Sequence, residues 1–204
     1  MYLKAEKKYS NNLKFVGYGI DLYKYLIKHE ERISNLEKII SIKKLDKLFG
    51  TIYVTSQMYL NNWIQKDFAE FQKKFSKIFN IYEAKKISKV DINKRKITVA
   101  FLSPDFHKDH SITYFIKSLL KDLKQTKFET YGLSLLREDQ HDESTEKLKP
   151  LFDNWSVIGR KTDQEIINII QDLKIDILID LGGLWSANRV SIFNTRICPL
   201  QISW

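Results

Sequence analysis

The stretch Ile97-Thr-Val-Ala-Phe-Leu-Ser103 decides the fold of this chain. It is a short apolar run that follows a polar, basic segment and ends at Pro104 and Asp105. A run of this length and composition is typical of a strand that is buried on both faces of a sheet. We therefore expect an α/β domain to begin just before Ile97.

From this strand to the last residue, short apolar runs alternate with helical patterns. Further strands are predicted at residues 128–134, 155–158, 175–181 and 197–204. Intervening helices are predicted over a segment whose apolar face runs from Ile112 to Leu123, over residues 143–152, and after a capping box formed by Thr162 and Glu165. Such alternation favours a parallel sheet with helices on both faces. Residues 96–204 are thus expected to form a Rossmann-like α/β lobe.

Residues 1–95 show helical patterns and no convincing strand. Weak apolar periodicity covers residues 20–40 and 45–60, with Gly50 as a break or bend. A stronger helical face follows Trp63 and consists of Ile64, Phe68, Phe71, Phe75, Ile78 and Tyr82. Apolar stripes of this kind are core rather than ligand sites in most proteins. The polar, basic and aperiodic segment 83–96 predicts a linker, with a domain boundary near residue 95.

The net charge of +9 raises the question of nucleic-acid binding. Only six of the 34 basic residues are arginine, whereas bidentate recognition of phosphates and bases favours arginine. The lysines are spread among glutamates and aspartates, as on solvated surfaces. The composition therefore argues against a nucleic-acid partner.

The remaining composition excludes several classes of site. The single cysteine, Cys198, cannot form an internal disulfide, and four scattered histidines give no metal-ligand spacing. No apolar run is long enough for a membrane span, and the charged N-terminus does not resemble a secretory signal. We expect a cytoplasmic protein without a metal site.

Candidate functional residues lie where the predicted strands end. In open parallel sheets, ligands bind beyond the carboxyl ends of the strands, which here means residues 103–110, 134–141 and 181–189. His110 stands at a predicted helix start in the first of these loops, and its near-neutral pKa suits proton transfer. As an alternative, His110 is an exposed helix-start residue close to Asp105 and Asp109.

Three segments together resemble the family 41 glycosyltransferases, the O-linked N-acetylglucosamine transferase and Spindly-like group. The first joins residues 97–106 to His110-Ser-Ile-Thr-Tyr-Phe115, and the second joins residues 175–183 to Asn188-Arg189. The third runs from residue 193 to Pro199-Leu-Gln-Ile-Ser-Trp204. Each is weak alone, but their order and spacing over about 108 residues make the resemblance specific.

The resemblance implies a two-lobed GT-B enzyme whose second lobe holds most of the nucleotide sugar. Residues 96–204 would be the N-terminal catalytic lobe, truncated before the donor-binding lobe. Residues 1–95 would be a remnant of TPR-like helical repeats and their linker. The implied reaction transfers a sugar, N-acetylglucosamine from UDP-GlcNAc, to protein hydroxyl groups without a cofactor, and the fragment alone would be inactive. The alternative is a non-catalytic interaction module derived from such an enzyme.

The resemblance also assigns roles to individual residues. It makes His110 the active-site histidine, although three residues separate it from Phe106 where the family has two, so Asp109 is a rival for that position. Asp105 either orients the histidine or bonds the backbone of its own turn.

The third strand-end loop supplies the other candidates. Gly183, beside Gly182, permits close backbone approach at the strand end. Asn188 and Arg189 match the family, and Arg189 either reaches an anion in the cleft or caps the helix that follows it. Leu184 replaces a hydrogen-bonding family residue, and this difference places acceptor choice or activity in question.

Overall fold

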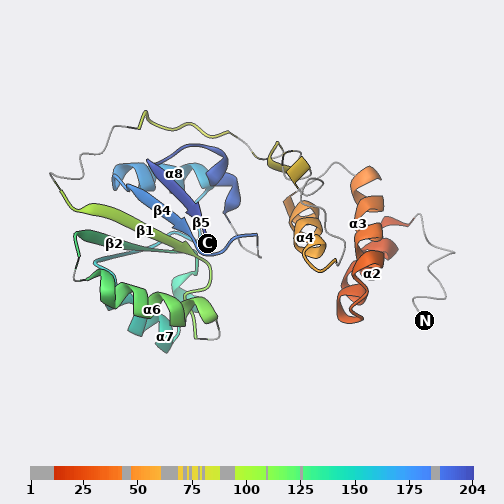
Figure 1. Ribbon diagram of the computed structural model, residues 1–204, viewed down its shortest axis with the longest axis horizontal. Helices are drawn as coiled ribbons and strands as arrows, with labels where there is room; N and C mark the ends of the chain where they lie inside the picture. Colours follow the sequence, from red (N-terminus) through yellow and green to blue (C-terminus); the bar gives the residue numbers. More distant parts are fainter. Residues whose placement is uncertain are drawn as a thin grey trace. The chain divides into compact units, whose positions relative to one another are not determined.

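The computed structural model describes residues 12–42, 47–60, 69–70, 73, 75–77, 79, 81–87, 95–108, 110–124, 126–184 and 189–204. The chain divides into two compact units, Met1–Asn80 and Ile81–Trp204 (Figure 1). Within the described residues, no helix is long and apolar enough to cross a membrane.

The first unit is helical, as expected, with helices α2 (Leu13–Tyr25), α3 (His29–Ile42) and α4 (Lys47–Gln57). Its core contains Val16, Ile20, Leu36 and Ile39, with Phe49, Ile52 and Tyr53 packed against them. The apolar pattern over residues 20–40 belongs to two helices rather than one. Helix α2 ends because Ile27 adopts the left-handed conformation (φ 57°), and the Lys28 N–H then bonds the Tyr23 carbonyl at 2.9 Å.

Two sequence expectations in this unit are corrected. Gly50 is not a break, because it lies inside α4, where a β-carbon would collide with the Phe75 ring. Tyr82 is not on a helix and belongs to the second unit. Residues 69, 70, 73, 75 and 76 are helical, whereas Ile64, Phe68, Phe71 and Ile78 lie outside the described residues.

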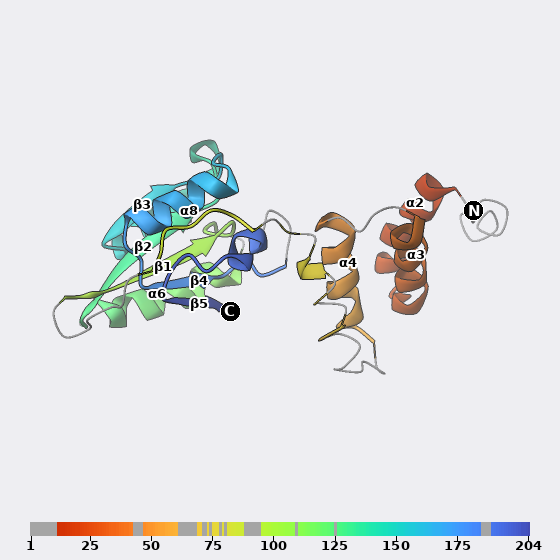
Figure 2. The same cartoon turned by 90° about the horizontal axis from the view of Figure 1, so that it is seen from above.

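The second unit contains the predicted parallel sheet. Its strands are β1 (Ile97–Ser103), β2 (Phe128–Ser134), β3 (Asn154–Val157), β4 (Ile177–Asp180) and β5 (Leu200–Ser203). They pair in the order β3-β2-β1-β4-β5, with every described pairing parallel (Figure 2). The expected α/β fold is confirmed, and open sheets of this kind bind ligands at the edge where the strands end.

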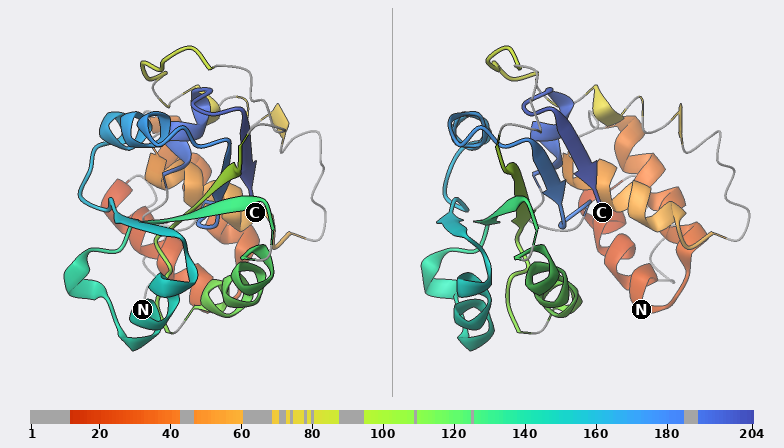
Figure 3. Two further views of the ribbon diagram at one scale, coloured as in Figure 1. Left: turned by 90° about the vertical axis from the view of Figure 1, so that its left-hand side faces the viewer. Right: turned by 60° about the vertical axis from the view of Figure 1, so that its left-hand side comes forward.

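Helices cover the two faces of the sheet (Figure 3). Helices α6 (Ser111–Leu123) and α7 (Glu143–Leu148), together with the short 3₁₀ turn η2 (Lys149–Leu151), pack on the face of Val99 and Phe101. Helix α8 (Asp163–Asp172) and the 3₁₀ helix η3 (Val190–Asn194) cover the face of Ala100 and Leu102. A further 3₁₀ turn, η1 (Glu138–Gln140), precedes α7.

The second unit starts earlier than the composition suggested. The Tyr82 N–H donates to Thr195 Oγ1 at 2.8 Å, and the Gln164 side-chain amide donates to the Glu83 carbonyl at 2.9 Å. Gln171 exchanges two hydrogen bonds with the Lys85 backbone, at 2.9 and 3.0 Å. Residues 81–87 therefore belong to the lobe, although their composition is that of a linker.

Candidate active site at the carboxyl edge of the sheet

The loops that follow β1 and β4 meet at the carboxyl edge of the sheet. A β-carbon at Gly182 would lie 2.9 Å from the Cδ atom of Pro104, which is closer than real β-carbons come to other heavy atoms. Only glycine allows this approach without a shift. The two loops that carry most of the candidate residues are thus in direct contact.

Asp180 fixes the β4 loop. Its carboxylate accepts hydrogen bonds from the N–H groups of Gly182 and Gly183, both at 3.0 Å, and from the Ser203 hydroxyl at 3.3 Å. Burial raises the pKa of the Asp180 carboxyl despite these bonds, because the charged form is desolvated. Gly183 takes φ 53°, which suits glycine. Both amides serve the protein itself, so neither is free for a phosphate group.

The β1 loop is fixed to helix α6 in a similar way. Phe106 is fully buried, and the Asp105 N–H donates to Ser103 Oγ at 3.0 Å. The Thr113 hydroxyl bonds the carbonyls of Asp105 and His107 at 3.1 and 2.7 Å. These bonds hold the Asp105 side chain beside the first turn of α6.

His110 is the N-cap residue of α6, and its side chain is 39% exposed. The Ile112 N–H donates to His110 Nδ1 at 3.3 Å, so the neutral ring carries its proton on Nε2. That nitrogen lies 3.7 Å from Asp105 Oδ2, and His107 Nε2 lies 3.8 Å from Asp105 Oδ1. The structure thus brings together His110 and Asp105, which the sequence analysis had singled out, and adds His107.

This geometry limits the proton transfers that are open to the His110 ring, because both of its nitrogens face a partner. Its Nδ1 lone pair is engaged by the helix, and its Nε2–H faces a carboxylate. The ring presents a hydrogen-bond donor, and it would have to release the Ile112 N–H in order to accept a proton at Nδ1. Asp109, the rival for the histidine position, lies outside the described residues.

The segment that follows β2 supports the β1 loop from the side. Asp142 caps α7 and accepts a hydrogen bond from the Lys108 N–H at 2.9 Å. The N–H groups of Lys108 and Thr145 lower the pKa of the Asp142 carboxyl to about 2. The adjacent His141 ring is buried beside Trp155. Neither side chain was singled out from the sequence, because Asp142 contacts Lys108 and His141 contacts Trp155, and these partners belong to other segments of the chain.

Arg189 points to the start of helix α8. It donates to Asp163 Oδ1 at 2.8 Å and to the carbonyls of Gly159 and Lys161 at 3.2 and 3.1 Å. The same carboxylate accepts hydrogen bonds from Tyr82 and Ser191. Burial alone would raise the pKa of the Asp163 carboxyl, but these partners outweigh it and lower the pKa. Asn188 lies outside the described residues, as do Trp185 and Ser186.

Within the described residues, no group of three or more His, Cys, Asp or Glu side chains is arranged to hold a metal ion. The site therefore consists of an imidazole donor, a carboxylate and two fixed loops. Such an arrangement suits binding and orienting a polar group, such as a hydroxyl, at the sheet edge.

Comparison with known proteins shows distant relatives. No family model matches the chain. It is 29% identical over 112 residues to the Arabidopsis thaliana protein described as probable UDP-N-acetylglucosamine–peptide N-acetylglucosaminyltransferase SPINDLY, covering 54% of this chain and 12% of that protein. The Solanum lycopersicum protein of the same description is 24% identical over 137 residues, covering 66% of this chain and 14% of that protein.

A solved structure shows the same fold. The chain superposes on part of the K341M mutant of Thermobaculum terrenum O-GlcNAc transferase with a TM-score of 0.82 and 18% sequence identity. The match covers 100% of this chain and 39% of the bacterial one. The chain is thus a distant sequence relative of the SPINDLY-type O-GlcNAc transferases, and it has the fold of part of a bacterial O-GlcNAc transferase.

Proposed function

We propose that this chain is the acceptor-side catalytic lobe of an O-linked N-acetylglucosaminyltransferase that acts on protein hydroxyl groups in the cytoplasm. The donor is UDP-GlcNAc, held mainly by a second lobe. The observation that carries the proposal is the pairing of His110 with Asp105 at the carboxyl edge, within the segment that resembles the family. The relatives span several times the length of this chain, which agrees with a lobe of a larger enzyme.

The proposed chemistry needs a hydroxyl group to be held in line with the sugar carbon that it attacks. The attack forms a bond from the hydroxyl oxygen to that carbon, while the bond from the carbon to the nucleoside diphosphate breaks and the hydroxyl proton passes to the departing diphosphate or to solvent. In the described geometry, His110 offers its Nε2–H to the hydroxyl oxygen, and Asp105 sets the direction of the ring. This supports orientation of the acceptor by His110 more than removal of its proton. Gly183 and Leu184 belong to the β4 loop, which meets the β1 loop at Pro104, and in this proposal they border the acceptor.

A chimaera tests the proposal. Residues 81–204 replace the corresponding segment of the Arabidopsis SPINDLY protein, and transfer of labelled sugar from UDP-GlcNAc to an acceptor peptide is measured. We expect turnover that is lost in the same chimaera carrying His110→Ala. A chimaera that melts cooperatively but transfers no sugar would favour the alternative, a non-catalytic interaction module.

A further inference from the structure

A groove with a volume of about 280 Å³ lies at the opposite edge of the sheet, away from His110. Arg95 and Asp176 line it and lie two residues before β1 and one residue before β4, so it is at the amino ends of the strands. The other walls come from residues 85–87, the C-terminal end of α8 and residues 197–199. Nothing in the proposed transfer chemistry uses this groove.

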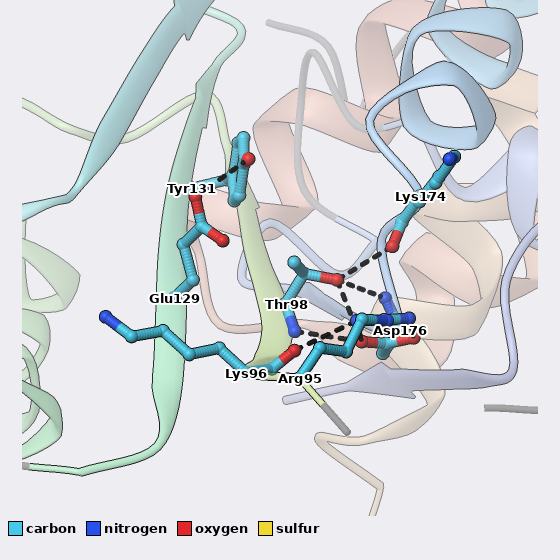
Figure 4. A network of polar contacts seen from close by, with 7 residues as sticks. All are labelled: Arg95, Lys96, Thr98, Glu129, Tyr131, Lys174 and Asp176. Atoms are coloured by element: carbon cyan, nitrogen blue, oxygen red, sulfur yellow. Dashed lines mark hydrogen bonds and ion pairs between the residues drawn. The ribbon is translucent and has the colours of Figure 1, made fainter. Parts of the chain in front are cut away.

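A network of polar contacts makes one wall of the groove rigid (Figure 4). The Arg95 guanidinium donates to both oxygens of Asp176, at 2.6 and 2.7 Å. Thr98 donates to the same carboxylate from its N–H at 2.9 Å and from its hydroxyl at 3.0 Å. The hydroxyl also bonds the Lys174 carbonyl at 2.8 Å. Among the described residues that line the groove, the single carboxylate is therefore neutralised by Arg95.

Two ammonium groups of the groove remain without a counter-charge. Lys85 pairs with Asp172, whereas no ion pair in the described part of the chain involves Lys86 or Lys174. In Figure 4, the Lys174 ammonium group points away from the Asp176 network. The two hydrogen bonds between Gln171 and the Lys85 backbone hold Lys86 in place at the rim. The groove thus presents a net positive charge on a fixed frame.

Lys174 occupies a backbone conformation that favours glycine. Lys174 follows the last turn of α8 and has φ 52°. The motif that ends the helix here is closed by a hydrogen bond of 3.2 Å from the Ile175 N–H to the Ile170 carbonyl. Glycine commonly fills this position, since a β-carbon is strained there. Strain that persists at a residue whose side chain lines a groove points to a function of that side chain.

We propose that this groove binds an acidic, extended peptide segment with an aliphatic side chain between its carboxylates. Lys86 and Lys174 supply the charge complementarity, and Ile175, Ile197 and Pro199 supply an apolar floor. A nucleic acid fits less well, because the described residues of the lining include no aromatic side chain for base stacking and their single arginine is already paired.

Fluorescence anisotropy with a labelled Glu-Glu-Leu-Glu-Glu peptide and the full chain tests the proposal. We expect saturable binding that weakens about fivefold in the double variant Lys86→Gln/Lys174→Gly, because two exposed ion pairs are lost. The matched control Lys117→Gln/Lys121→Gln removes the same charge from α6, on the other face of the sheet, and is expected to bind like the wild type.

The single variant Lys174→Gly separates a functional side chain from a structural one. We expect its melting temperature to rise while peptide binding falls, because glycine relieves the strain and removes the charge. The proposal is overturned by equal loss of binding in both double variants, by no binding in the wild type, or by a lower melting temperature in Lys174→Gly. Tighter binding of single-stranded oligo-dT than of the peptide at this groove would also overturn it.

Discussion

The Arg189 guanidinium lies 2.8 Å from the carboxylate of Asp163, so the end of the β4 loop is tied to the first residue of α8. Asp163 also accepts the Tyr82 hydroxyl at 2.8 Å, which adds the segment before β1 to the same cluster. Three parts of the chain that are distant in sequence therefore share one carboxylate. Its partners make Arg189 an anchor of the loop. Arg189 stands at the N-cap position of η3, but its side chain makes no capping hydrogen bond there, because the guanidinium is bonded to Asp163, Gly159 and Lys161.

We expect Arg189→Ala to lower the free energy of unfolding by about 2 kcal/mol, because it leaves a half-buried carboxylate with fewer partners. Urea denaturation measures the loss. Arg189→Lys should recover only a minor part, since a lysine cannot bond Asp163 and two carbonyls together. Wild-type stability in Arg189→Ala would show that the anchor is not structural.

Stability should depend on pH through Asp176. Burial alone raises the pKa of its carboxyl, but Arg95 and Thr98 outweigh that effect and the pKa lies below its ordinary value. A carboxyl with a lowered folded-state pKa stabilises the fold above its unfolded pKa of about 3.9 and loses this contribution as the pH falls through the folded pKa. Asp176→Asn should therefore melt well below the wild type at neutral pH, and the two melting temperatures should converge in acid. A constant gap across the pH range would contradict this account.

The turn between α2 and α3 offers a stabilising substitution. Ile27 is 77% exposed and has φ 57°, so its branched side chain is strained and contributes little to packing. Ile27→Gly should raise the free energy of unfolding by roughly 1 kcal/mol. The neighbouring Leu26 does not have a positive φ, and Leu26→Gly should lower stability. Thermal melts of both variants test this prediction. A lower stability of Ile27→Gly as well as of Leu26→Gly would contradict strain at Ile27.

His110 variants in a full-length or chimaeric enzyme separate the roles open to this residue. His110→Ala should lower turnover by about 10²–10⁴ whether the ring orients or deprotonates the hydroxyl. His110→Asn keeps a helix cap and a donor, so it should retain part of the activity only if orientation is the role. If Asp109 instead fills the family position, Asp109→Ala causes the larger loss and His110→Ala is nearly silent. Small effects from all three would leave His110 as a helix cap alone.

The 204-residue chain by itself should not bind the donor measurably. The resemblance assigns the nucleotide sugar to a second lobe, and the amides of Gly182 and Gly183 are occupied by Asp180. Calorimetric titration with UDP-GlcNAc checks this expectation. Micromolar affinity would reveal a donor site in these residues.

The strands of the lobe were predictable because each is a short apolar run between polar segments. The predicted bounds of β1 and β2 agree with the structure, whereas the apolar run at residues 175–181 yields only Ile177–Asp180 as strand. The capping box of α8 was also predictable, since Thr162 and Glu165 satisfy each other locally at 2.7 and 3.3 Å. Features that depend on residues close together in the chain, such as an apolar run or a capping box, can be predicted from the sequence alone.

The candidate site was predictable only in part. The rule that ligands bind at strand ends placed His110 and Asp105 in one loop, and the structure brings their side chains together. The direction of Arg189 was not predictable, because it depends on Asp163, the first residue of helix α8. Asp180 was missed as well, although a carboxylate at the end of an apolar strand implies hydrogen-bond donors close to it in the fold.

The attachment of residues 81–87 to the lobe has a practical consequence for anyone who expresses it separately. A fragment that begins at residue 96, where composition suggests a natural start, would lose Tyr82 from Asp163 and the Lys85 backbone from Gln171. It would expose one side of α8 and remove a wall of the groove at the amino edge. The smallest fragment that keeps its surface intact begins at Ile81, and limited proteolysis should stop near that residue rather than at the first strand.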